Sequence, residues 1–535
     1  MPQPQLQNTQ RSPVLLSSYG VLAACAFVFP AAYLVYRGVT EDAAPLNLLL
    51  TRRTLQPLWG SLRLAVSVSV SAMTLGTALA WLTARCDLPA ARLWRVLLPL
   101  PLVFPSFLSA AAFIYALNPG GLINDLLATV GIDQTLEMRG FFGAWVVLTL
   151  ITYPYVYLPV VARIRQLSGT LEESARLLGD TAFMVFCRIC LPQMASAMAA
   201  GALLVFLYTV SDFGAVQLMR YDTLTRVIYS NRLINQPVAL SLSLILMAVA
   251  VVVVLTERMI SRRLPEGTPT RVSPPIIYSL GSWRTSALGF VGLSLVASMG
   301  VPMLSLLYWA YRGILLSLRN ERAFAVGLSQ FVDATVNTIG VGLVTAVVAV
   351  ITVLPLAMLL GRFRSRVGSV AHTVVITMFA LPAILVALSV RWALHLGVFP
   401  SLAAFGMVFL VFAYVVRFGS LAMGVSLLAV RNVPAQLHEV AQVLGASGFR
   451  RFLKVDSPML APALFAGAGL VLISVMKELP ISLLVSPLGF RTLAMHIFHS
   501  AEEGFIAEMS MMAIVLLVAL FILIWLLRVF CEDVY

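Results

Sequence analysis

The chain has 535 residues, of which 60% are hydrophobic and 11% are charged, and its mean hydropathy is +0.94. This composition excludes an ordinary water-soluble domain and indicates a protein that crosses a membrane several times. The formal net charge is +13, but the basic residues lie between apolar runs and not along a solvated face, so we expect no nucleic-acid partner. The five cysteines are too scattered to predict a disulfide framework.

Twelve apolar windows follow one another along the chain, each close to the roughly 20 residues that an α-helix needs to cross the hydrocarbon core. The first six cover residues 14–36, 58–84, 94–117, 141–162, 195–217 and 237–256. The second six cover residues 285–311, 334–360, 369–392, 402–427, 461–485 and 507–530. No convincing small-residue cleavage site follows the first window, so we interpret it as a retained helix. The sequence therefore predicts an all-α, polytopic protein with about twelve transmembrane helices in a lipid bilayer.

The two sets of windows are separated by a linker rich in proline and arginine. We place a first transmembrane repeat at residues 1–256, the linker at 257–284 and a second repeat at 285–535. Because six spans return the chain to the side from which it started, both halves are predicted to have the same orientation. The expected architecture is two parallel six-helix repeats.

A spaced pattern in each half indicates that the chain is one module written twice. A Glu, an Ala, a Gly and a Pro recur at an offset of 266 residues, which is about half the length of the chain. Within residues 171–192 they are Glu173, Ala175, Gly179 and Pro192, with Leu191 before the proline. Within residues 437–458 they are Glu439, Ala441, Gly445 and Pro458.

Each of these loops is predicted to be a helix, a glycine break and a second helix. In the first loop we expect Gly179 to end one helix and Asp180 or Thr181 to cap the next. The small Ala175 and Gly179 would leave room for the surface of another protein.

The charges of the loops predict their side of the membrane. The loops that carry the spaced pattern, and those on the same side, are rich in arginine, whereas alternate loops such as 118–139 are mixed in charge. Basic loops stay in the cytoplasm. We therefore expect both patterned loops and the N-terminus to be cytoplasmic.

The spaced pattern resembles the EAA loop of ABC-importer permeases, from which the first copy departs only by Ser174 in place of alanine. The resemblance implies a type I ABC-importer transmembrane fold in a bacterial inner membrane. It also implies that the patterned residues of both loops couple the chain to two ATP-binding-cassette ATPase subunits. A periplasmic or lipid-anchored binding protein would deliver the substrate.

The chain lacks an ATP-binding site of its own. A P-loop requires Lys followed by Ser or Thr, but Lys454 precedes Val455 and Lys477 precedes Glu478. We therefore expect no enzymatic activity and no bound cofactor. Cys187 and Cys190 form a lone CxxC inside the first loop, for which a packed helix face is favoured over a metal or redox site.

Two acidic residues near the ends of apolar windows also obey the offset of 266, namely Asp212 and Glu478. Placing a charged side chain in a membrane span costs free energy, so a charge there needs a reason. We expect either that these carboxylates belong to the substrate pathway and bind a metal in transit, or that they are helix-end carboxylates bonded to loop amides. Arg417 in the tenth window would neutralise Glu478, or Arg417 and Lys477 together would assist the passage of an anionic complex. Tyr153 is a further pathway candidate, with packing as the alternative.

Several phrases narrow the resemblance to the fused, two-repeat permeases of ferric-iron importers. They are Tyr153–Tyr157, Ser211–Gln217, Lys477–Pro480 and Gly489–Ala494. Permeases for thiamine, polyamines or phosphonates are built similarly and stay open as alternatives. From another class, a twelve-helix secondary transporter would also fit two parallel halves.

Overall fold

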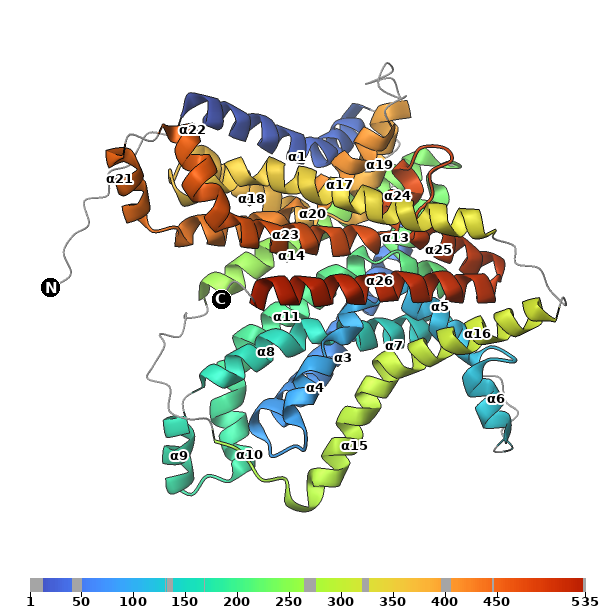
Figure 1. Ribbon diagram of the computed structural model, residues 1–535. Coiled ribbons are helices and arrows are strands. Elements are labelled where there is room, and N and C mark those ends of the chain that lie inside the picture. The colour runs from blue at the N-terminus through green and yellow to red at the C-terminus, as the bar shows by residue number, and fades with distance from the viewer. Residues whose placement is uncertain are drawn as a thin grey trace. The chain divides into compact units, whose positions relative to one another are not determined.

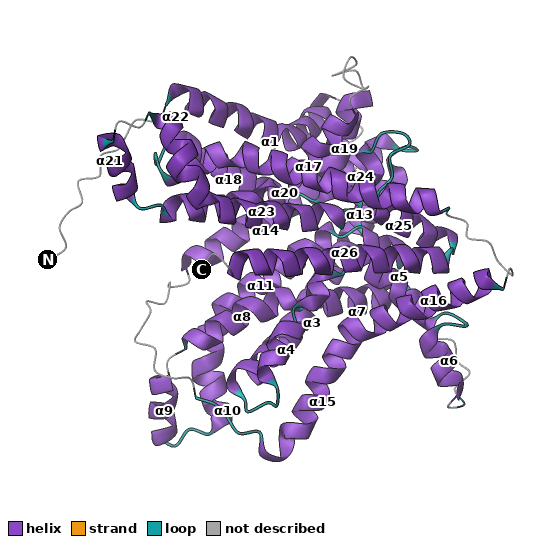
Figure 2. Cartoon of the chain, viewed as in Figure 1, coloured by secondary structure: helices purple, strands orange, loops and turns teal. Residues whose placement is uncertain are grey.

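The computed structural model describes residues 13–40, 51–129, 131, 138–167, 169–263, 276–319, 327–395, 406–444 and 447–532. These residues form helices joined by loops, with no strand among them (Figure 2). Among the described residues, eleven helices are long and apolar enough to cross a membrane, and the number is twelve if one bent pair of helices counts as a single span. The prediction of an all-α protein with about twelve transmembrane helices is confirmed.

The bent pair is the ninth predicted span, which changes direction by 102° between α18 (Arg366–Ala380) and α19 (Ala383–His395). Proline disfavours helical backbone in the residue before it. Leu381, which precedes Pro382, is accordingly extended, with φ −68° and ψ 123°. The first half breaks in the same way before Pro105, where Phe104 is extended and α5 (Ser106–Leu117) begins directly after the proline.

The described chain divides into two compact units that differ from the sequence halves at the first span of each half. Unit 1 comprises residues 1–40, 326–496 and 515–535, and unit 2 comprises residues 41–325 and 497–514. Helix α1 (Val14–Thr40) thus belongs with the second half, whereas α15 (Arg284–Leu295) and α16 (Val301–Leu318) belong with the first. The two terminal helices α25 (Leu493–Glu503) and α26 (Ile506–Glu532) each have residues in both units.

Unit 1 is built around α17 (Leu328–Gly361), which packs against α20 (Gly406–Asn432) and α23 (Ser457–Met476) (Figure 1). Helix α1 lies on α18 and α19. The shorter helices of this unit are α21 (Ala435–Val443), α22 (Gly448–Arg451), the π turn η6 (Phe452–Asp456) and α24 (Pro480–Val485).

Unit 2 is built around α3 (Arg52–Arg85), which packs against α8 (Pro154–Gln166) and α11 (Leu191–Ser211). Glycine permits these close contacts, because a Cβ on Gly76 would lie 2.8 Å from the Tyr153 carbonyl oxygen. The other helices are α4 (Ala91–Leu97), η1 (Leu100–Val103), α6 (Leu122–Thr129), α7 (Gly140–Thr152), α9 (Gly169–Leu177), α10 (Ala182–Val185), η2 (Phe186–Cys190), α12 (Gly214–Leu218), α13 (Leu224–Asn231), α14 (Gln236–Arg263), η3 (Gly281–Trp283) and η4 (Val296–Gly300).

Each unit contains a side-chain hydrogen bond that has an equivalent in the other unit, so the repeat extends to side-chain detail. Ser61 Oγ on α3 accepts a bond of 2.8 Å from the backbone N–H of Leu224. Thr338 Oγ1 on α17 accepts a bond of 2.8 Å from the backbone N–H of Leu493. In each unit a hydroxyl on the central helix therefore binds the first residue of a short helix that begins at the Leu of a Thr-Leu pair.

Candidate functional site

The described helices of the two patterned loops correspond one to one. Helices α9 and α21, the short helices α10 and α22, and the π turns η2 and η6 all lie 266 residues apart. In each unit the loop carries a short helix before the long helix α11 or α23 (Figure 1). The predicted helix, break and second helix are present in the first loop. The break of the second loop, including Gly445, lies outside the described residues.

Gly179 ends α9 in a Schellman motif. Its φ is +97°, in the left-handed region that residues with a Cβ rarely adopt. The N–H of Asp180 donates to the carbonyl of Ala175 and the N–H of Gly179 donates to that of Arg176, both at 3.1 Å. These bonds satisfy carbonyls that the end of the helix would otherwise leave without partners.

Side-chain caps begin the second helix of each loop. Thr181 Oγ1 accepts from the N–H of Met184 at 3.3 Å, as predicted for one of the two candidate caps. Ser447, which lies 266 residues further on, accepts from the N–H of Arg450 at the same distance. The caps thus keep their position while the residue type changes.

The prolines of the pattern explain the π turns that precede them. Pro192 and Pro458 each stand at the second position of a long helix and have no N–H to donate. The preceding residues Leu191 and Ser457 donate instead five residues back, to the carbonyls of Phe186 and Phe452. The recurring proline therefore sets the turn through which each loop enters its membrane helix.

Each loop presents a pair of exposed apolar residues that the sequence analysis missed. Leu177 and Leu178 are 89% and 88% exposed, and Val443 and Leu444 are 87% and 80% exposed. Both pairs lie outside the spans, where exposed adjacent apolar side chains mark interaction sites. The offset of 266, which relates the pairs, was the signal that could have found them.

The acidic and small residues of the pattern face different ways. Glu173 is exposed beside the apolar pair, whereas the side chain of Glu439 lies outside the described part of the structure. Ala175 and Ala441 are only 8% and 7% exposed. The small alanines therefore permit close packing of the loop helices against their own chain, and not the approach of another protein that we expected from the sequence.

A buried ion pair joins the first loop to the end of α3, and sequence reasoning did not find it. Arg85 Nη2 lies 2.9 Å from Glu172 Oε1, and the two side chains are 0% and 1% exposed. The Tyr278 hydroxyl, which comes from the end of the linker, donates to Glu172 Oε2 at 2.7 Å. Burial and the bond to Glu172 raise the pKa of Tyr278, which keeps its hydroxyl protonated as a donor.

The second loop has a related ion pair. Arg362 directly follows the last residue of α17, and Arg85 is the last residue of α3. The Nη1 atom of Arg362 lies 3.1 Å from Asp456 Oδ2 in η6. Asp456 is 266 residues after Cys190, not after Glu172. Both central helices thus end in an arginine paired with an acid of the loop, but the acid comes from different positions.

The two matched carboxylates, Asp212 and Glu478, cap short helices. Asp212 Oδ2 accepts from the N–H groups of Ala215 and Val216 at 3.0 and 3.3 Å. Glu478 Oε1 accepts from the N–H of Ile481 at 3.0 Å. This is the alternative of helix-end carboxylates bonded to loop amides, and it is compatible with a further role in the pathway.

The remaining pathway candidates differ in their surroundings. Tyr153 is fully buried and its hydroxyl donates to the Leu98 carbonyl at 2.7 Å, which favours packing. Arg417 donates to the Phe379 carbonyl, stacks on that ring and interacts electrostatically with Glu478. Lys477 directly follows α23 and is partly exposed. Among the described residues, no group of three or more His, Cys, Asp or Glu could hold a metal ion.

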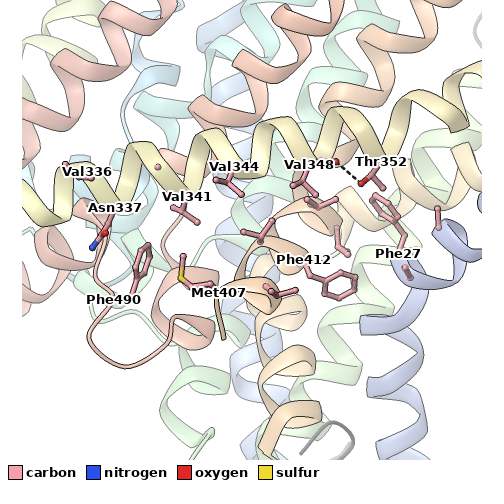
Figure 3. A pocket seen from close by; sticks show the side chains of 17 residues that line it. Phe27, Val336, Asn337, Val341, Val344, Val348, Thr352, Met407, Phe412 and Phe490 are labelled. Atoms are coloured by element: carbon pink, nitrogen blue, oxygen red, sulfur yellow. Dashed lines mark hydrogen bonds between the residues drawn. The ribbon is translucent and has the colours of Figure 1, made fainter. Parts of the chain in front are cut away.

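Two cavities in the described chain differ in character. A groove of about 720 Å³ in unit 1 is lined by α1, α17 and α20, with apolar side chains such as Phe27, Val341 and Phe412 turned into it (Figure 3). Its lining does not suit a charged cargo. A polar cavity of about 420 Å³ in unit 2 is lined by residues that include Arg139, Gln217, Arg220, Arg226, Glu502 and Glu503.

Comparison with known proteins identifies the class to which this architecture belongs. The chain matches the family described as "Binding-protein-dependent transport system inner membrane component" over residues 63–265 and again over 353–532. It therefore belongs to this family of ABC-importer permeases and contains the family's membrane domain twice. It is a multi-pass inner-membrane protein whose relatives are transport permeases, a family that works with ATPase and substrate-binding partners. The alternative of a secondary transporter is wrong.

Individual relatives match both repeats, one repeat or part of one. The "Fe(3+)-transport system permease protein FbpB 2" of Haemophilus influenzae is 26% identical over 529 residues, which cover 97% of this chain and 99% of that protein. The "Molybdenum transport system permease protein ModB" of Mycobacterium tuberculosis is 31% identical over 46% of this chain and 95% of its own length. The "Sulfate transport system permease protein CysT" of Escherichia coli is 28% identical over 26% of this chain and 50% of its own length.

Proposed function

We propose that this chain forms the translocation pathway of an importer for ferric iron delivered by a periplasmic or lipid-anchored binding protein. The observation that carries the coupling part of the proposal is the duplicated loop, with an exposed apolar pair at the same place in each copy. Each loop would dock one ATP-binding subunit, so that one copy of this chain serves two. ATP hydrolysis is assigned to these separate subunits.

Docking at the loops would involve both apolar and charged contacts. Leu177 and Leu178 would enter an apolar cleft of the first ATP-binding subunit, as Val443 and Leu444 would for the second. Glu173 and Glu439 would face basic groups of these subunits. Gly179, Gly445, Leu191, Pro192 and Pro458 would shape the loops, and Ala175 and Ala441 would seat them. The loops and the N-terminus would then lie in the cytoplasm.

Ferric iron is favoured as the cargo because a relative that covers both repeats is named for Fe(3+) transport. Asp212 and Glu478 would supply hard oxygen ligands or a negative field to iron in transit. Arg417, Lys477 and Tyr153 are assigned supporting roles along the path. The sequence repeats would keep their boundaries at residues 1–256 and 285–535, joined by the linker 257–284.

A substrate-stimulated ATPase assay tests this proposal. The chain is reconstituted with its ATP-binding subunit and binding protein, and hydrolysis is measured with ferric iron, molybdate, 2-aminoethylphosphonate, thiamine and a polyamine. The oxyanion and phosphonate arms are included because several relatives carry those names. We expect ferric iron alone to stimulate hydrolysis. Stimulation by another cargo only would reject iron while leaving the coupling proposal intact.

A further inference from the structure

The end of the interrepeat linker is attached to the first loop through Tyr278. The backbone N–H of Tyr278 donates to the Arg85 carbonyl at 2.8 Å, and the Asp87 N–H donates back to the Tyr278 carbonyl at 3.2 Å. The Tyr278 ring lies 5.5 Å from the ring of Trp81, which in turn lies 4.7 Å from that of Phe186 in η2. One residue of the linker thus touches both the central helix and the loop region.

Hydrogen bonds orient the guanidinium group of Arg85 toward the first loop. Its Nη2 donates to the carbonyls of Ile164 and Leu167, both at 3.3 Å, and forms the ion pair with Glu172. Glu172 precedes Glu173 on α9, so the buried acid and the exposed one leave the same helical turn. Fixing Glu172 therefore fixes the direction in which α9 presents Glu173 and the apolar pair.

We propose that Arg85, Glu172 and Tyr278 are positioning residues of the first coupling loop, and that Arg362 and Asp456 position the second. The inference rests on the proposed function of the loops in ATPase coupling. Each loop is held by an ion pair at the end of a central helix, and the linker adds a further contact to the first loop.

The repeat itself suggests how to test the ion pair. In the first loop the thiol of Cys190 interacts with both Glu172 and Arg85. The second loop has Asp456 at the position equivalent to Cys190. An acid placed at residue 190 should therefore reach Arg85 when the acid at residue 172 is removed.

The first readout is loop mobility in the full-length chain, measured by a spin label at residue 178 in a background with all cysteines replaced by serine. Tyr278→Phe and Glu172→Gln should each increase the mobility of this label. A label at residue 444, which is 80% exposed in the second loop, should not respond. Tyr311→Phe removes a hydroxyl from a side chain that is 64% exposed and is the matched control. Unchanged mobility at residue 178 in both variants would overturn the proposal.

The second readout is radiolabelled ferric iron transported per ATP hydrolysed by the reconstituted complex with native cysteines. Glu172→Gln should lower this ratio about tenfold, because a buried arginine loses its charged partner, while the ATP-binding subunit still co-purifies. Adding Cys190→Asp should restore most of the ratio. A fall of transport and hydrolysis in proportion, or a folded double variant without recovery, would contradict positioning. Failure of the unaltered chain to bind an ATP-binding subunit would instead reject the proposed function.

Discussion

Replacing Gly179 by valine tests the shape of the first loop without removing a contact. Gly179 has φ +97°, and a Cβ built on it would meet no atom within 4 Å, so backbone strain is the whole penalty. A left-handed conformation costs about 1–2 kcal/mol in a residue with a side chain. If α9 leaves its docking orientation to relieve this strain, affinity for the ATP-binding subunit should fall about tenfold, since about 1.4 kcal/mol corresponds to that factor.

The assay is a titration of the detergent-solubilised chain with its ATP-binding subunit, together with the unfolding midpoint of the chain alone. The midpoint should change little, because the loop lies outside the spans. Gly448→Ala is the control, since its Cβ would also meet open space, its φ is not left-handed, and the first loop already has Ala182 at the equivalent position. Unaltered affinity in Gly179→Val, or the same loss in Gly448→Ala, would refute the reasoning.

Three further changes test charge, pathway and orientation. Glu173→Lys combined with Glu439→Lys should leave an inserted protein that no longer co-purifies with its ATP-binding subunit, and full recovery of the subunit would refute this docking mode. Asp212→Asn with Glu478→Gln keeps oxygen acceptors for the helix caps but removes charge, so iron uptake should fall far more than protein level; unchanged uptake would reduce both residues to caps. A cysteine at Leu178 should react with an impermeant reagent only from the cytoplasm, and labelling from outside would reverse the orientation.

The repeat allowed much of the local structure of the loops to be predicted from sequence. Gly179 acts through its own backbone and Thr181 through a bond to a residue three positions on, so the helix end and the cap could be predicted without knowledge of distant contacts. The π turn before Pro192 was not predicted. The twelve spans could also be predicted from the sequence, because the length of an apolar run decides whether a helix can cross the membrane.

Other features depend on contacts between distant segments, which periodicity does not report. Arg85 and Tyr278 are 193 residues apart, and only packing brings them to one carboxylate. From the sequence we expected the loop alanines to face another protein, but Ala175 and Ala441 are buried against their own chain. No local feature of the sequence shows that the first span of each half belongs to the same unit as the other half.

The central claim is that each of two equivalent loops docks one ATP-binding subunit. The most direct test is the native mass of the complex purified through a tag on this chain, whose own mass is 58.0 kDa. The account predicts one copy of the chain with two ATP-binding subunits, and loss of one subunit when Leu177 and Leu178 are replaced by serine. A complex with a single ATP-binding subunit, or one that keeps two after that replacement, would contradict it.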